Sequence, residues 1–381
     1  MSTPNSLEQA TVSDDGRYNV TTDQFRNFRR DGFVVVRGLV PDEHIEELRQ
    51  HTDDLMQGRL PEQTTSMAAR DTKQDGGVTV QGLEAPPKGL SPYEKAQHYL
   101  RIHMLHRCLE LHERYLLHPR VLDVLEAIIG PDVMAMQSML FLKPPGKPGQ
   151  GWHQDSYYIP TYPDTLCGAW IAIDDCDEFN GAMWMAKGSG HEPVHPPCPE
   201  YGYGFGDRFV SDVQYVKGVS ETVDDVNDLS KIAAQYDQVL LTARAGDVVF
   251  FNGHVLHRSK QNVSTDRCRR AFVGHYANAR SFTQWGSDEA RPRGRDDFPA
   301  RDEETGMTNG SHILARGNTH LPFAKPAFGT ECAALHPKDV RKRQSLDTAL
   351  RIAAANHGLE GCAMKEPVDP EGARANVSAA Y

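Results

Sequence analysis

Short runs of β-branched, aromatic and other apolar residues in the middle of the chain constrain its fold more than any other feature. Turns rich in Gly, Pro and Asp separate these runs, and no helix pattern lies between most of them. The runs expected to form strands cover residues 133–142, 167–173, 182–186, 239–242, 248–251 and 271–277. Many short strands without intervening helices are typical of an antiparallel sandwich, a jelly roll or a barrel. We therefore expect a mainly β protein.

The residues before this region are expected to be mostly helical. Thr21 and Gln24 have capping-box spacing at the start of a helix that should end at Gly32. The β-branched residues 33–36 predict a strand, and the mixed residues 59–90 predict a loop. Further helices are expected over residues 45–56 with a cap at Gly58, over 91–109, and over 121–129 with an end at Gly130.

We divide the chain into three parts. Residues 1–20 are a polar tail, and residues 21–280 form one domain that contains both the helical part and the β region. An interruption at 192–238 is rich first in Tyr and Gly and then in acidic residues, and a segment of that length is expected to be a lid or a flexible insertion. Residues 281–381 are polar apart from a helix pattern at 346–355, and we expect them to pack on or beside the domain as an extension.

The charge and the cysteines exclude several classes of protein. The 381 residues carry 41 Lys and Arg against 52 Asp and Glu, a formal charge of −11, and an acidic chain is poorly suited to nucleic acid or to anionic membranes. The chain contains no run of about 18 apolar residues, which a helix needs to cross a bilayer. The polar N-terminus lacks a signal segment. The seven scattered cysteines form no CxxC, which disfavours a disulfide framework and a structural zinc site. We expect a cytoplasmic protein with a small-molecule substrate; its oligomeric state stays open.

Three residues could hold a metal ion. His153 and Asp155 are two residues apart, so in an extended segment their side chains point to the same face. His257 is the best candidate for a third ligand, because a turn and a strand at 246–251 lead directly to it. Two histidines and one carboxylate form the facial triad of non-haem Fe(II) oxygenases, which leaves positions open for a co-substrate and O₂. In isolation, however, a His-x-Asp pattern also describes a loop histidine beside a solvated aspartate.

A basic segment follows His257. An arginine at the start of the strand at 271–277 could return beside the metal and bind the far end of a dicarboxylate through a bidentate fork. Arg269 and Arg270 are the candidates, and alternation along the strand would place them on opposite faces. The other interpretation is a surface arginine in a basic turn.

Two other histidine patterns are interpreted as structural. The segment His191-Glu192-Pro193-Val194-His195 has the spacing of a zinc-protease helix, but Pro193 would break that helix, so we expect a loop without a zinc site. Further histidines are expected to form a polar helix face in the first third of the chain, at positions 98, 103, 106, 112 and 118.

A series of motifs runs in order through residues 21–280. They include Gly130-Pro131-Asp132, Met139-Leu140, Lys143-Pro144-Pro145, Trp152-His153-Gln154-Asp155, Ala169-Trp170, Asn180-Gly181-Ala182, Lys187-Gly188-Ser189-Gly190-His191, Gly246-Asp247 and His257-Arg258-Ser259. Together these motifs resemble the phytanoyl-CoA dioxygenase family, and their order makes the resemblance far more specific than any single motif. It implies a double-stranded β-helix (jelly-roll) core that uses Fe(II), 2-oxoglutarate and O₂.

The resemblance also implies roles for individual residues. The implied iron ligands are His153, Asp155 and His257. The residues implied to bind or line the 2-oxoglutarate pocket are Arg269, which would pair with the far carboxylate, together with Ser259, Trp170, Met139 and, on a helix, Arg101. One extra residue between the second histidine and the arginine keeps Arg270 open as the alternative anchor.

The reaction implied by the resemblance is hydroxylation of an unactivated C–H bond in a small organic substrate, with release of succinate and CO₂. Halogenating relatives have a small residue in place of the carboxylate, so Asp155 favours hydroxylation. A desaturase or cyclising oxidase on the same iron site, and a non-catalytic metal-binding member of the family, are the alternatives. The substrate class stays open between an acyl-CoA, which a basic cluster at 338–343 could suit, and a secondary metabolite.

Overall fold

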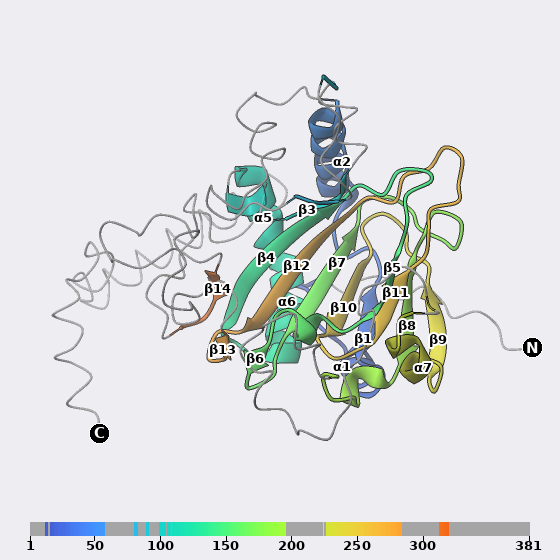
Figure 1. Ribbon diagram of the computed structural model, residues 1–381. Coiled ribbons are helices and arrows are strands. Elements are labelled where there is room, and N and C mark those ends of the chain that lie inside the picture. The colour runs from blue at the N-terminus through green and yellow to red at the C-terminus, as the bar shows by residue number, and fades with distance from the viewer. Residues whose placement is uncertain are drawn as a thin grey trace, which may run out of the picture. The chain divides into compact units, whose positions relative to one another are not determined.

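Antiparallel β-sheet forms the centre of the computed structural model, and helices cover one side of it (Figure 1). The chain divides into two units, Met1–Ala333 and Ala334–Tyr381, and the described residues all lie in the first. Within them, the strands form sheets of eight, four and two strands. The residues that the structure describes are 12–13, 16–57, 80–82, 89–90, 99–103, 105–107, 109–195, 224, 226–283 and 312–319.

The larger sheet has the spatial order β1-β10-β7-β12-β4-β3-β2, and β14 pairs with the first residues of β4. Its strands are β1 (Phe33–Val36), β2 (Val80–Gly82), β3 (Tyr99–His103), β4 (Val133–Phe141), β7 (Cys167–Ala172), β10 (Val248–Asn252), β12 (Ala271–Asn278) and β14 (Ile313–Arg316). The smaller sheet has the order β5-β11-β8-β9, with β5 (Gln150–His153), β8 (Met183–Lys187), β9 (Asp237–Leu241) and β11 (His257–Ser259). A separate pair consists of β6 (Thr161–Tyr162) and β13 (Phe282–Thr283).

The chain passes repeatedly from one sheet to the other. Strands β4, β7, β10 and β12 belong to the larger sheet, whereas β5, β8, β9 and β11 belong to the smaller one, and every strand pairing is antiparallel. This alternation is the topology of a double-stranded β-helix. The expected jelly roll is therefore confirmed, and each of the six strands predicted in the β region is present, as is β1.

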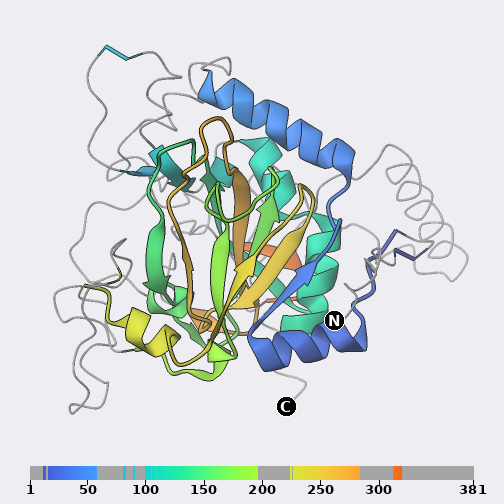
Figure 2. The ribbon, with the colours of Figure 1, turned by 90° about the vertical axis from the view of Figure 1, so that its right-hand side faces the viewer.

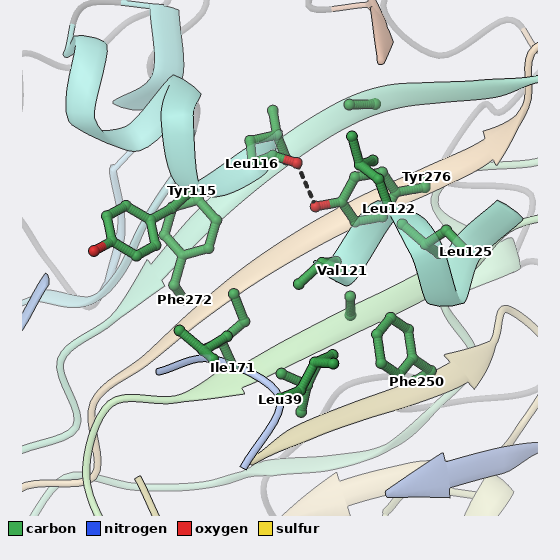
Figure 3. Packing of buried hydrophobic residues seen from close by; sticks show 14 of the residues in the cluster. Leu39, Tyr115, Leu116, Val121, Leu122, Leu125, Ile171, Phe250, Phe272 and Tyr276 are labelled. Atoms are coloured by element: carbon green, nitrogen blue, oxygen red, sulfur yellow. Dashed lines mark hydrogen bonds between the residues drawn. The ribbon is translucent and has the colours of Figure 1, made fainter. Parts of the chain in front are cut away.

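The larger sheet buries both of its faces. Phe272 and Tyr276 of β12 belong to a core that the sheet shares with the helices, whereas Ala271 and Val273 belong to the interior between the two sheets. This division follows the two-residue period of a strand. Figure 3 shows the helix-side core, where the Tyr276 hydroxyl donates to the Leu116 carbonyl at 2.7 Å. The opposite face of β12 packs against residues of the smaller sheet, such as Met185 and Leu241.

Helices complete the outer core (Figure 2). The start of the first forms the expected capping box, with Gln24 N donating to Thr21 Oγ1 at 3.1 Å and Thr21 N donating to Gln24 Oε1 at 2.9 Å. It ends as expected at Gly32, whose φ of 86° is favoured by glycine. No helix of the described residues could span a membrane. The helices are α1 (Thr22–Asp31), α2 (Asp42–Met56), α5 (Glu110–Leu116), α6 (Pro119–Ile129) and, beside the smaller sheet, α7 (Leu229–Ala233).

The helix predicted over residues 91–109 is wrong over residues 99–107, and residues 91–98 lie outside the described residues. Tyr99–His103 forms strand β3, which pairs with β4, and Leu105–Arg107 forms a short 3₁₀ turn. Local helix signals are weak compared with a full set of backbone hydrogen bonds to a neighbouring strand. Among the described residues, the next helix after this turn is α5.

The expected polar histidine face is also wrong. His106, His112 and His118 are at most 1% exposed. Neither ring nitrogen of His112 has a hydrogen-bond partner among the described groups. Burial, reinforced by the charges of neighbouring histidines and, for His118, of Arg120, holds the pKa values of His112 and His118 well below that of an exposed histidine.

Several predictions lie outside the described residues. They concern the cap at Gly58, most of the loop at 59–90, residues 196–223 of the insertion, and the helix at 346–355. In the described part of the insertion the chain forms α7 and begins β9, and after residue 280 it forms β13 and β14.

Candidate metal centre

The structure brings His153, Asp155 and His257 together between the two sheets. His153 ends β5 and is the direct partner of His257 at the start of β11, and their ring centroids are 4.1 Å apart. Asp155 Oδ1 lies 3.6 Å from His153 Nε2 and 3.7 Å from His257 Nε2. All three residues are buried. Among the described residues, they are the one group of three or more His, Cys, Asp or Glu side chains that could share a metal ion.

Backbone carbonyls fix the orientation of both imidazole rings. His153 Nδ1 lies 2.8 Å from the Gly151 carbonyl, and His257 Nδ1 lies 3.0 Å from the Val255 carbonyl. Because a carbonyl only accepts, each Nδ1 must carry the hydrogen. In the neutral ring the Nε2 lone pair is then directed to the common point, which is the arrangement that metal-binding histidines use.

A fourth residue, His275 of β12, holds the carboxylate of Asp155. His275 Nε2 and Asp155 Oδ2 are 2.9 Å apart, so Oδ1 is left facing the two imidazoles. Burial opposes the ionisation of Asp155, but attraction to the imidazoles of His257, His275 and His153 in their protonated forms, together with the hydrogen bond from His275, outweighs burial and keeps the pKa of Asp155 well below its usual range. His275 is absent from the predicted site residues, because it stands in an apolar strand outside any motif. The available signal was its position two residues after Val273, which places both side chains on the same face of the strand.

The next layer of the interior contains two of the predicted pocket residues. Val273 of β12 is paired on one side with Met139 of β4 and on the other with Trp170 of β7, and all three belong to the core between the sheets. Beyond them, the guanidinium carbon of Arg269 lies 5.8 Å from the Trp170 ring and 5.5 Å from the Phe141 ring. This interior is therefore apolar in the middle and basic at one end.

Ser259 lies near this basic end. It follows His257 by two residues on β11, where a bulge interrupts the pairing with β5. Its hydroxyl is 3.2 Å from Lys143 Nζ, and the carbonyl of Gly181 accepts from both Lys143 and Arg269. The three predicted residues Met139, Trp170 and Arg269 thus form one contiguous group in the interior between the sheets, and Ser259 is connected to it through Lys143.

The two candidate arginines have different surroundings. Arg270 donates from Nε and Nη2 to the carboxylate of Asp174, at 2.8 and 2.7 Å, and also contacts Asp53. Arg269 is 2% exposed and donates from Nε to the Gly181 carbonyl at 3.1 Å. No carboxylate of the described residues forms an ion pair with it. Of the two, only Arg269 has a guanidinium available to a ligand in the interior.

The zinc-protease pattern is not a helix. Its first residue ends a 3₁₀ turn, Ser189–His191, and the remainder is extended. The segment is hydrogen-bonded to Gln154, which stands between two residues of the triad: Gln154 Nε2 donates to the Pro193 carbonyl at 3.0 Å, and His195 N donates to Gln154 Oε1 at 3.1 Å. The expectation of a loop is confirmed, and this loop supports the turn between His153 and Asp155.

Arg101 is in a strand rather than a helix. Its backbone lies in β3 opposite Phe141 of β4. Phe141 in turn contacts Arg269, so the register places Arg101 beside the basic end. Its part in the pocket stays a prediction, because its side chain is outside the described set.

Known proteins resemble this chain over the region that contains the β-sheets and the candidate metal ligands. The family model for Phytanoyl-CoA dioxygenase (PhyH) matches residues 28–271. The human peroxisomal phytanoyl-CoA dioxygenase is 27% identical over 265 residues, which cover 68% of this chain and 69% of the relative. A probable phytanoyl-CoA dioxygenase of Caenorhabditis elegans is 27% identical over 269 residues, with 68% and 76% covered. The solved structure of the epimerase SnoN with Fe³⁺, alpha ketoglutarate and nogalamycin RO is 17% identical, covers 80% of this chain and 94% of its own, and has a TM-score of 0.48.

A jelly roll that encloses two imidazoles and a carboxylate within reach of one metal ion is typical of a metal-dependent oxygenase. The chain belongs to the phytanoyl-CoA dioxygenase family, whose model matches well over half of its length. It is an Fe(II)- and 2-oxoglutarate-dependent dioxygenase, and O₂ is a co-substrate beside 2-oxoglutarate.

Proposed function

We propose that His153, Asp155 and His257 bind Fe(II), that Arg269 binds the distal carboxylate of 2-oxoglutarate, and that the enzyme hydroxylates an unactivated C–H bond of a small organic substrate. The observation that carries this proposal is the buried His-Asp-His group with its ligand atoms within 4.8 Å of one another. The guanidinium of Arg269, which forms no ion pair with a carboxylate of the described residues, supports the second part.

The donor set suits a ferrous ion. Two neutral imidazole nitrogens and one carboxylate oxygen are the ligands of non-haem Fe(II) sites, and they occupy one face of the metal. His275 would keep Asp155 in position by holding its other oxygen, in the way that outer hydrogen bonds commonly orient metal ligands. Because the carboxylate is present, the site favours hydroxylation over halogenation.

The interior between the sheets suits 2-oxoglutarate. Arg269 would bind the distal carboxylate with its two Nη groups, while Met139 and Trp170 pack along the apolar carbon chain. When bound, Fe(II) would supply the oxidising chemistry that turns 2-oxoglutarate and O₂ into succinate, CO₂ and a hydroxylated product. The protein contributes fixed ligands, a basic anchor and an apolar lining, including Val249 and Phe251, that excludes water.

The relatives guide the choice of substrate. Those described above are named for phytanoyl-CoA, so acyl-CoA thioesters are the first class to test, and other small metabolites are the second. A desaturase or a cyclising oxidase would use the same residues, because the fate of the substrate depends on its placement beside the metal.

A substrate screen tests this proposal. The enzyme is supplied with Fe(II), 2-oxoglutarate and O₂, and succinate release is compared with and without each candidate. A true substrate should raise succinate release and gain one oxygen atom, seen as a mass increase of the product. A product that has lost two hydrogens instead would indicate desaturation or ring closure. An absence of succinate with every substrate, and of 2-oxoglutarate binding, would contradict the proposal.

A further inference from the structure

Lys143 is a buried lysine that the proposed function does not use. Its side chain is fully buried, in the segment just after β4. Its side-chain nitrogen, Nζ, lies 3.3 Å from the Gly181 carbonyl oxygen and 3.2 Å from Ser259 Oγ, and it also contacts the Lys260 carbonyl. All three partners are uncharged oxygens. A buried lysine normally has a carboxylate partner, and within the described part of the chain Lys143 has none.

Lys143 and Arg269 lie side by side. The Gly181 carbonyl accepts from Arg269 Nε at 3.1 Å as well as from Lys143 Nζ, and Arg269 N donates to the Lys143 carbonyl at 3.0 Å. A Cβ at Gly181 would be 2.7 Å from Lys143 Nζ, and the φ of 84° there also favours glycine. The shared carbonyl therefore sets two basic groups next to each other at the end of the proposed 2-oxoglutarate pocket.

Charged groups on the neighbouring elements are engaged elsewhere. Asp174 binds Arg270, Asp177 binds Arg267, and Lys260 Nζ lies over the Trp184 ring. Burial, with a smaller contribution from the charge of Arg269, lowers the pKa of Lys143 to about 5. Burial lowers the pKa of Arg269 only to about 10, because the charges of Cys176 and Asp174 oppose it. At neutral pH the guanidinium keeps its proton and Lys143 is a neutral amine.

The charge of Lys143 decides the direction of the Ser259 hydroxyl. A neutral amine has two N–H donors and one lone pair. With both donors on the carbonyls of Gly181 and Lys260, its lone pair must accept from the Ser259 O–H. An ammonium donates to all three oxygens instead. Ser259 Oγ also accepts from Gln150 N at 3.3 Å. When the ammonium and Gln150 N both donate to Oγ, the hydroxyl hydrogen has no acceptor among these groups and is free to point to a ligand.

We propose that Lys143 is a positioning residue of the 2-oxoglutarate pocket: it takes up a proton from solvent as the distal carboxylate binds Arg269, and it thereby frees the Ser259 hydroxyl to donate to that carboxylate. The carboxylate neutralises the charge that repels the ammonium and adds an attractive one, and both changes favour protonation. One N–H bond forms at Nζ, and no other covalent bond changes. The inference rests on the proposed function, since it needs the dicarboxylate at Arg269.

The test is calorimetric titration of 2-oxoglutarate into the Fe(II)-loaded enzyme in the absence of O₂. Measurement at one pH in two buffers of different ionisation enthalpy gives the number of protons taken up per ligand. The wild type should show net uptake, and its affinity should rise as the pH falls from about 8 to about 6.5. Protonation of histidine ligands would act in the opposite direction, because it weakens metal binding.

Lys143→Met should abolish the proton uptake and the rise in affinity at lower pH, because methionine cannot be protonated, whereas Ser259, whose hydroxyl then has no acceptor at this position, can still donate to the carboxylate. The matched control is Lys147→Met, four residues along the same segment, which should keep both properties. A wild type that binds 2-oxoglutarate without proton uptake would overturn this inference and leave the proposed function standing, whether or not Lys143→Met folds. Equal uptake by Lys143→Met would also overturn it. A wild type that does not bind 2-oxoglutarate would overturn both.

Discussion

Replacement of Arg269 by Ala is expected to raise the 2-oxoglutarate concentration needed for half-maximal turnover by about 100-fold. In the structure this arginine is 2% exposed, its Nε is held by the Gly181 carbonyl, and its side chain lies against the Trp170 and Phe141 rings. These contacts fix the plane of the guanidinium. Its two Nη groups form no ion pair with a carboxylate of the described residues, which leaves them for a ligand.

The magnitude follows from the two hydrogen bonds that a bidentate carboxylate would lose. Hydrogen bonds to charged groups contribute about 1.5–3 kcal/mol each, and the two are not additive, so about 3 kcal/mol is a reasonable net value. Each 1.4 kcal/mol is roughly a factor of ten in affinity, which gives about 100-fold. Iron binding should change little, because Arg269 is not among the proposed ligands.

Succinate release at increasing 2-oxoglutarate concentrations measures this effect, and Arg270→Ala is the matched control. That variant loses the bidentate pair with Asp174 and the contact with Asp53. It should therefore lower the free energy of unfolding by about 2 kcal/mol without changing the 2-oxoglutarate requirement. If Arg270→Ala raised the requirement and Arg269→Ala did not, the anchor assignment would be wrong. If neither variant changed it, 2-oxoglutarate would not be held at this end of the interior.

Three further predictions concern the metal ligands, the buried histidines and the core. His275→Ala should weaken Fe(II) binding about 10- to 100-fold in an anaerobic titration, because Asp155 Oδ2 loses its partner; unchanged affinity would show that the contact does not position the ligand. Below about pH 6.5 His112 and His118 bind protons in the unfolded chain but not in the folded protein, because their pKa values in the folded protein are lowered. The free energy of unfolding, measured by denaturant titration, should therefore fall by about 1.4 kcal/mol per pH unit for each residue. The slope should be shallower in His112→Phe, and an equal slope would contradict this prediction. Phe272→Ala, at a fully buried position, should cost about 3–5 kcal/mol of unfolding free energy, and a loss below about 1 kcal/mol would refute the packing in Figure 3.

Much of the fold could be predicted because its strands satisfy local and global requirements at once. Runs such as 248–251 are β-branched or aromatic and are buried on both faces, so local propensity and burial agree. The two ligand-bearing strands could not be found in this way. Gln150–His153 and His257–Ser259 are short and polar, and only their pairing with each other and with β8 makes them strands. His153 and His257 can be identified as ligand candidates from a motif, but not from the secondary structure that the sequence predicts.

The errors have the same physical origin. The helix prediction fails at Tyr99–His103, because pairing of this segment with β4 outweighs its local helix signals. His275 and Lys143 carry no motif of their own. Their importance depends on which side chains face them, Asp155 in one case and Arg269 with Ser259 in the other, and these contacts exist only in the folded chain. Spacing alone cannot show such contacts.

Anaerobic equilibrium dialysis of Fe(II) tests the central claim most directly. The wild type should bind one Fe(II) per chain, and His153→Ala and His257→Ala should each lose it, whereas His191→Ala should bind like the wild type. His191 is the matched control, because it is an exposed histidine of the zinc-protease pattern that the structure places outside the triad. Full binding by His153→Ala, or loss of binding in His191→Ala alone, would contradict the assignment of His153, Asp155 and His257 as the iron site.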